Sequence, residues 1–202
     1  DFCLSRGLGD VYKRQILEPY TIFSERELFT ALKKCWKSQF GLSLLSTYYD
    51  SGFAFYLPKI AVVAQEMVFG DVSGNIITHN PKIKNTCLIY AIWGLYDESF
   101  LNKNSGCDLY TVDLKDLEII DEKIGRQEMQ SVRVGDTTEE LPISPLARSS
   151  QKLSDEQIKS LGKLAREVIR HYFFPQMIKW SMKKNKIFIL DLGPQIIEPV
   201  LK

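Results

Sequence analysis

The chain has 202 residues, of which 45% are hydrophobic, and this proportion is ample for a globular protein with a buried core. Its 26 basic and 25 acidic residues give a formal net charge of +1. Near neutrality argues against a protein that binds nucleic acid by neutralising many phosphates, because such domains carry a clear basic excess. The apolar content argues equally against an acidic, disordered chain.

The first fifteen residues, DFCLSRGLGDVYKRQ, resemble the translated read-through of a sequencing adapter that is often attached to reading frames from metagenomic assemblies. We therefore expect residues 1–15 to be artefactual or disordered. Residues 16–202 are expected to form a single domain.

The cysteines and the hydropathy of the sequence indicate where in the cell the protein is located. Beyond the first fifteen residues the chain has three cysteines and no CxxC pair, namely Cys35, Cys87 and Cys107. An odd number of widely separated cysteines favours reduced thiols and therefore a cytoplasmic location. No stretch approaches the roughly 18 consecutive apolar residues that a membrane-spanning helix needs, so no membrane association is expected.

A first amphipathic helix is predicted to begin at a capping box. The Ser24 hydroxyl is placed to accept the amide of Glu27, and the Glu27 carboxylate is placed to reach back to the amide of Ser24. Apolar residues then recur at three- and four-residue spacing from Leu28 to Phe40, and Gly41 supplies a left-handed stop.

A second, longer helix follows the same rules near the C-terminal end. Its capping box runs from Ser154 to Gln157, and its apolar stripe runs from Ile158 to Tyr172. Pro175 cannot donate to the helical ladder, so it either kinks this helix or begins a new one at Gln176. The apolar pattern continues as far as Trp180, which favours helical structure there.

Between the helices the chain is rich in β-forming residues and turn signals. The segment 59–69 favours a buried strand, with a helix as the alternative. Gly70 to Asn75 is predicted to be a turn. The clearest hairpin joins strands at 108–114 and 117–124. Further strands are expected at 42–49, 53–57, 76–78, 87–96 and 187–190.

The composition changes between Gly125 and Ser150, where a long polar loop is predicted, with one short strand at Val132 and Val134 as an option. Because the strands come in a run and do not alternate with helices, we predict an α+β fold. The expected architecture is a mostly antiparallel meander flanked by an N-terminal helix and a long C-terminal helix.

Charged residues on the predicted hairpin resemble the D…(D/E)xK arrangement of metal-dependent nucleases. Asp108 or Asp113 lies on the first strand, and Asp121 and Lys123 lie on the second. The resemblance implies that Asp108 and Asp121 hold Mg²⁺ while the lysine orients a water molecule. The Pro-Asp pair usual in that family is absent, because Cys107 precedes Asp108.

Exposed acids and lysines are also common on hairpins, so surface decoration is the simpler interpretation of this pattern. Neither His79 nor His171 belongs to a zinc-binding motif, and Gly70 to Gly74 lacks the spacing of a glycine-rich phosphate loop. The favoured hypothesis is a non-catalytic binding or interaction protein with an unknown protein partner and no cofactor. The alternative is a Mg²⁺-dependent nuclease that acts on nucleic acid.

Overall fold

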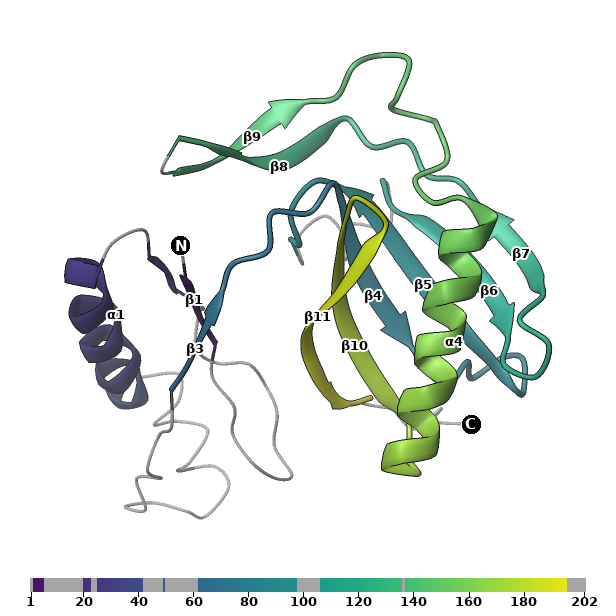
Figure 1. Ribbon diagram of the computed structural model, residues 1–202, viewed down its shortest axis with the longest axis horizontal. Coiled ribbons are helices and arrows are strands. Elements are labelled where there is room, and N and C mark those ends of the chain that lie inside the picture. The colour runs from purple at the N-terminus through teal and green to yellow at the C-terminus, as the bar shows by residue number, and fades with distance from the viewer. Residues whose placement is uncertain are drawn as a thin grey trace. The chain divides into compact units, whose positions relative to one another are not determined.

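The computed structural model describes residues 2–5, 20–22, 25–41, 49, 62–97, 106–135 and 137–195. The chain folds into two compact units, Asp1–Met67 and Val68–Lys202, and each is described by itself. Figure 1 shows the helices and strands with their labels.

The first unit contains three short strands, one helix and a single 3₁₀ turn. Their bounds are β1 (Phe2–Ser5), β2 (Tyr20–Ile22), α1 (Glu25–Lys37), η1 (Ser38–Phe40) and β3 (Val63–Glu66). The strands form an antiparallel sheet in the order β2-β1-β3. The predicted first helix is confirmed as α1, whose apolar stripe contributes the buried Ala31 and Cys35. The left-handed stop expected at Gly41 is wrong, because this residue is extended with φ of −65° and ψ of 141°.

Several predictions for this part of the chain remain predictions. Strand β1 lies within the first fifteen residues, and the hypothesis that this segment is foreign to the natural protein is not tested by the strand. Ser24, the expected cap of α1, lies outside the described residues. So do the strand expected at 53–57 and all but the last residue of the one expected at 42–49.

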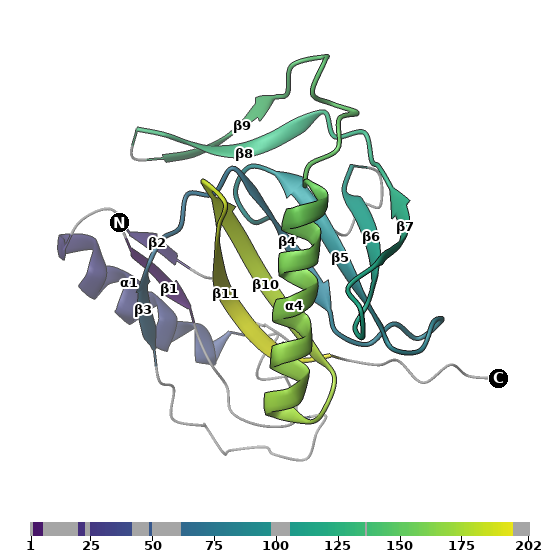
Figure 2. The ribbon, with the colours of Figure 1, turned by 45° about the vertical axis from the view of Figure 1, so that its right-hand side comes forward.

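The second unit is built on six strands: β4 (Val72–Ile77), β5 (Thr86–Trp93), β6 (Asp108–Asp113), β7 (Ile119–Lys123), β10 (Gln176–Lys183) and β11 (Lys186–Pro194). They lie in the order β11-β10-β4-β5-β6-β7, and every neighbouring pair is antiparallel. The long helix α4 (Asp155–Tyr172) runs across one face of this sheet (Figures 1 and 2). The predicted α+β class and the hairpin β6–β7 are confirmed.

The turn predicted over Gly70 to Asn75 is wrong, because β4 begins at Val72 and continues through Gly74. At Gly74 the carbonyl oxygen of Tyr90 on the neighbouring strand occupies the space that a Cβ would take. Glycine therefore marks a close approach of two backbones within the sheet, and the usual association of glycine with turns misled the prediction.

The helix predicted beyond Pro175 is also wrong. Helix α4 ends at Tyr172 and is capped by Phe173, which adopts the left-handed conformation with φ of 60°, and Pro175 cannot continue the ladder. The next residues form β10, which pairs with β4 on one side and β11 on the other. Buried apolar side chains recur there at every second position, the period of a strand: Ile178, Trp180 and Met182.

The segment predicted as a long loop contains a two-stranded ribbon, β8 (Met129–Val134) and β9 (Thr137–Pro142), which extends past one end of the six-stranded sheet (Figure 1). The buried side chain of Gln127, a residue that is 2% exposed, joins the start of this ribbon to the end of β5 by hydrogen bonds. Its side-chain oxygen accepts from the backbone nitrogen of Trp93 at 2.8 Å, and its side-chain nitrogen donates to the carbonyl of Met129 at 2.9 Å.

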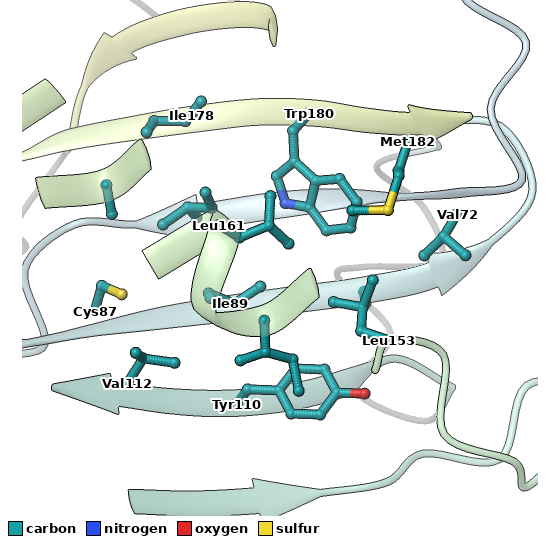
Figure 3. Close-up of a cluster of buried hydrophobic side chains, with 14 of the residues drawn as sticks. Val72, Cys87, Ile89, Tyr110, Val112, Leu153, Leu161, Ile178, Trp180 and Met182 are labelled. Carbon is teal, nitrogen blue, oxygen red and sulfur yellow. The ribbon is translucent and has the colours of Figure 1, made fainter. Parts of the chain in front are cut away.

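The main core lies between the sheet and α4. Figure 3 shows apolar side chains from several strands gathered on this face, among them Ile89 of β5, Val112 of β6 and Trp180 of β10. Gly162 allows α4 to approach β6 closely, because a Cβ at this position would lie 2.9 Å from Cγ1 of Val112. The buried face of α4 is formed by Ile158, Leu161, Gly162, Ala165 and Val168.

A buried ion pair joins three segments at the edge of this core. Asp108 and Lys152 are 0% and 3% exposed, and the Lys152 ammonium donates to Asp108 Oδ1 at 2.6 Å. The same carboxylate accepts from the backbone nitrogens of Lys152 at 2.8 Å and Gly125 at 2.9 Å, and from the Tyr110 hydroxyl at 2.7 Å. The pair therefore ties β6 to the segments that follow β7 and precede α4.

Tyr110 is a hydrogen-bond donor to this pair across the physiological pH range. Burial of its side chain, followed by the hydrogen bond to the Asp108 carboxylate, raises the pKa of the phenol well above its usual value. The hydroxyl accordingly keeps its proton and continues to satisfy the carboxylate.

We predict that the reciprocal cap of α4 contributes measurably to stability. The Ser154 side chain accepts from the Gln157 nitrogen at 3.4 Å, and Gln157 Oε1 accepts from the Ser154 nitrogen at 2.8 Å. Ser154→Ala should lower the free energy of unfolding by about 1 kcal/mol. Ser160→Ala, on the exposed side of the same helix, is the matched control and should cost less than about 0.5 kcal/mol. Urea denaturation measures both, and equal losses would contradict the prediction.

We predict a larger loss at the buried ion pair. Asp108→Ala leaves the Lys152 ammonium buried without its carboxylate and should lower the free energy of unfolding by about 3–5 kcal/mol. Glu128→Ala breaks the exposed pair with Arg126, whose atoms lie 3.6 Å apart, and should cost less than about 1 kcal/mol. Chemical denaturation distinguishes the two. A loss below about 1 kcal/mol for Asp108→Ala would show that the pair is dispensable.

Candidate functional site

The four residues predicted as a nuclease site do not come together in the structure. Asp108 is occupied by the donors described above, on the side of the sheet that α4 covers. Asp121 and Lys123 are exposed on β7, and the strand pairing places them on the opposite side. Asp113 closes the turn after β6, where its Oδ1 accepts from the Lys115 nitrogen at 2.6 Å. The two carboxylates expected to share Mg²⁺ therefore point to opposite faces.

Other simple kinds of site are also missing from the part of the chain that the structure describes. There, no three His, Cys, Asp or Glu side chains gather into a group that could hold a metal ion. Burial raises the pKa of the Cys87 thiol to about 12 and raises that of Cys107 as well, so both thiols keep their protons. Neither of the described helices α1 and α4 is long and apolar enough to cross a membrane.

The face of the sheet that is turned away from α4, called the far face below, has a different character. Side chains alternate along a strand, so the residues between those of the α4 core point to this face. A hydrogen bond of 3.2 Å between the hydroxyls of Ser73 and Ser181 confirms that β4 and β10 present these side chains to the same face. Members of the far face from β4, β5, β10 and β11 include Ser73, Asn75, Tyr90, Ile92, Lys179, Ser181 and Asp191.

Four of these residues lie side by side on neighbouring strands. Lys179 of β10 pairs with Asp191 of β11 on one side and with Asn75 of β4 on the other, and Asn75 pairs with Tyr90 of β5. We call these four residues the cross-strand row. Adjacent strands are about 4.8 Å apart, so the row places Tyr90 and Lys179 about 10 Å from each other.

Lys179 brings a buried positive charge to the row. Its side chain belongs to a residue that is only 7% exposed, and its Nζ lies 5.4 Å from the centre of the Tyr96 ring. This distance is within the range of a cation–π interaction. Lysine is rarely buried to this extent, because removing the ammonium from water is costly unless other groups offset its desolvation.

An aromatic and apolar cluster adjoins this lysine. The buried Ile92 and Cys107 pack with the half-buried Tyr90 and Tyr96. Burial, and to a lesser degree the proximity of Cys107, raises the pKa of Tyr90, so its phenol stays neutral. The cluster therefore presents flat, uncharged surface next to a cation.

Asn75 adds a hydrogen-bond acceptor between Tyr90 and Lys179. Its Oδ1 is buried and has no hydrogen-bond partner among the described residues. Leaving a buried acceptor unsatisfied costs roughly 1–3 kcal/mol, so such a group needs an explanation. A ligand hydroxyl or amino group that donates to Asn75 would supply one.

The far face is thus suited to a ligand with a flat ring system at one end and an anionic group at the other. The sequence predictions missed it because they placed Lys179 in a helix and Asn75 in a turn. The signal that could have found it is the alternation of polar residues with Ile178, Trp180 and Met182, which indicates a strand with one apolar and one polar face.

Comparisons with known proteins show what this chain is related to. The family model described as "Pyruvate phosphate dikinase, AMP/ATP-binding domain" matches residues 16–198. The chain is 30% identical over 174 residues to a probable phosphoenolpyruvate synthase of Archaeoglobus fulgidus, which covers 86% of this chain and 23% of that protein. It is also 30% identical over 166 residues to a rifampicin phosphotransferase of Bacillus subtilis, which covers 81% of this chain and 19% of that protein.

A third relative, a probable phosphoenolpyruvate synthase of Methanocaldococcus jannaschii, is 30% identical over 166 residues, or 81% of this chain and 14% of that protein. The chain therefore spans about a quarter or less of the length of these relatives.

The comparisons correct the functional hypotheses drawn from the sequence. The family description names an AMP/ATP-binding domain, and the relatives are named as enzymes, so the non-catalytic interaction module and the nuclease are both wrong. The spacing of Gly70 to Gly74, which does not fit a glycine-rich phosphate loop, was no evidence against nucleotide binding. Nucleotides are also bound by side chains that meet only in the folded protein. Since the family model covers most of its length, the chain belongs to the family of pyruvate phosphate dikinase AMP/ATP-binding domains.

Proposed function

We propose that the chain binds an adenine nucleotide on the far face and serves as the AMP/ATP-binding part of a larger enzyme that transfers a phosphoryl group. The family match supports the choice of ligand. The observation that supports its placement is the Lys179 ammonium, 5.4 Å from the centre of the Tyr96 ring and beside the aromatic cluster.

The aromatic cluster suits the adenine ring. Tyr90 and Tyr96 are partly exposed and provide flat aromatic surface, and the buried Ile92 packs against them. Stacking of a base on an aromatic side chain contributes about 1–3 kcal/mol to binding. The buried thiol of Cys107 packs against these rings and stays neutral, because burial raises its pKa.

Lys179 suits the phosphate groups. An ammonium is a compact charge that attracts phosphate oxygens, and a partly buried position strengthens this attraction because the local dielectric constant is lower than that of water. Ser73 and Ser181, on the neighbouring positions, are not required for the phosphates. The Ser73 hydroxyl already donates to the carbonyl of Gly94 at 2.6 Å, so these serines serve the sheet itself.

We propose that the molecule that accepts the phosphoryl group binds to other parts of the enzyme. The chain spans a quarter or less of its relatives, whose names include both phosphoenolpyruvate synthase and rifampicin phosphotransferase. Those names indicate different substrates, so the proposal extends to the nucleotide and leaves the acceptor open. The cytoplasmic location and the protein partner expected from the sequence remain predictions.

We predict that a change in the aromatic cluster weakens nucleotide binding. Tyr90→Ala should raise the dissociation constants of AMP and ATP about tenfold, because it removes part of the surface for the base. Tyr172→Ala, at the end of α4, is the matched control and should leave both constants unchanged. Isothermal titration calorimetry on the full chain measures them, with thermal unfolding to confirm that both variants are folded.

Two results would contradict the proposal. If the unaltered chain binds neither AMP nor ATP at millimolar concentration, nucleotide binding is wrong. If Tyr90→Ala and Tyr172→Ala bind as tightly as the unaltered chain, the far face is not where the nucleotide lies.

A further inference from the structure

The centre of the cross-strand row carries a positive charge, at Lys179. We propose that this ammonium holds the nucleotide phosphates in place of a divalent cation, so that the chain binds metal-free adenine nucleotide. This inference rests on the proposed function, and it adds which ionic form of the nucleotide the far face prefers.

Lys179 lies on a central strand of the sheet and next to the aromatic cluster. Strand β10 lies between β4 and β11, so Lys179 stands inside the sheet and not at its edge. Its Nζ adjoins the same aromatic cluster that suits the base, 5.4 Å from the Tyr96 ring centre. A nucleotide whose base lies on Tyr90, at the other end of the cross-strand row, therefore has its phosphates within reach of the ammonium.

The charges beside Lys179 in the cross-strand row do not favour a magnesium ion. Magnesium in nucleotide sites is usually held by one or two carboxylates together with the phosphates. In the cross-strand row the only carboxylate is that of Asp191, and its Oδ1 accepts from the backbone nitrogen of Leu192 at 2.9 Å. Lys179 lies directly beside Asp191 in the register, so its positive charge both offsets the carboxylate and repels a second cation.

Asn75 fits the space between the base and the phosphates. It pairs with Tyr90 on one side and with Lys179 on the other, so the order along the row is aromatic ring, amide and ammonium. This order matches the base, sugar and phosphates of a nucleotide. The buried Oδ1 of Asn75, which lacks a partner among the described residues, is placed to accept from a ribose hydroxyl.

The experiment compares ATP binding with and without magnesium. Calorimetric titration of the full chain with ATP in excess EDTA should give a dissociation constant equal to or lower than that in excess Mg²⁺, because the metal neutralises charge that Lys179 would otherwise attract. Lys179→Met should weaken binding in EDTA at least tenfold. Lys163→Met, on the exposed surface of α4, is the matched control and should change nothing.

A charge reversal sharpens the comparison. Lys179→Glu would place two carboxylates, with that of Asp191, in register on neighbouring strands. This variant should lose ATP binding in EDTA and regain it when Mg²⁺ is added, whereas Lys179→Arg should behave like the unaltered chain. Far-ultraviolet circular dichroism checks that each variant is folded.

The possible outcomes separate the two proposals. Binding of ATP by the unaltered chain only in the presence of Mg²⁺ would overturn this inference and leave the proposed function in place. Binding in neither condition would overturn the proposed function. The comparison of the unaltered chain in EDTA and Mg²⁺ needs no substitution, so it decides the matter even if Lys179→Met does not fold.

Discussion

The second unit depends on the burial of one face of its sheet under α4. Ile89, Val112 and Trp180 must point toward the helix to be removed from water. Because successive side chains of a strand point to opposite sides, the residues between them are directed to the far face. The positions of Asn75 and Lys179 are thus consequences of the core, and the packing of α4 determines which side chains are available to a ligand.

Two buried lysines show how surroundings assign a role to a charge. Lys152 is bound by the Asp108 carboxylate, which accepts four hydrogen bonds and has no capacity left for a metal ion. Lys179 lies beside aromatic rings on the other side of the sheet. The first lysine holds segments of the fold together, and the second gives the far face a positive charge, which the proposed function assigns to the nucleotide phosphates.

The candidate site has no short motif because each of its parts comes from a different strand. The cross-strand row takes one residue from each of β5, β4, β10 and β11, and the pair β10 and β11 lies far along the chain from the pair β4 and β5. A search for spacings in the sequence recognises ligands that are supplied by one loop or one helix. It found instead the acids of a hairpin, whose members the sheet directs to opposite faces.

Local patterns were enough to predict α1, α4, the hairpin β6–β7 and the antiparallel α+β class, because capping boxes and alternation act over a few neighbouring residues. They were not enough for β10, whose apolar residues suit a helix as well as a strand. Its conformation was settled by hydrogen bonds to β4 and β11, which are contributed by other parts of the chain. The burial of Asp108 and Lys179 likewise depends on long-range contacts, since solvation and charge are properties of a three-dimensional neighbourhood.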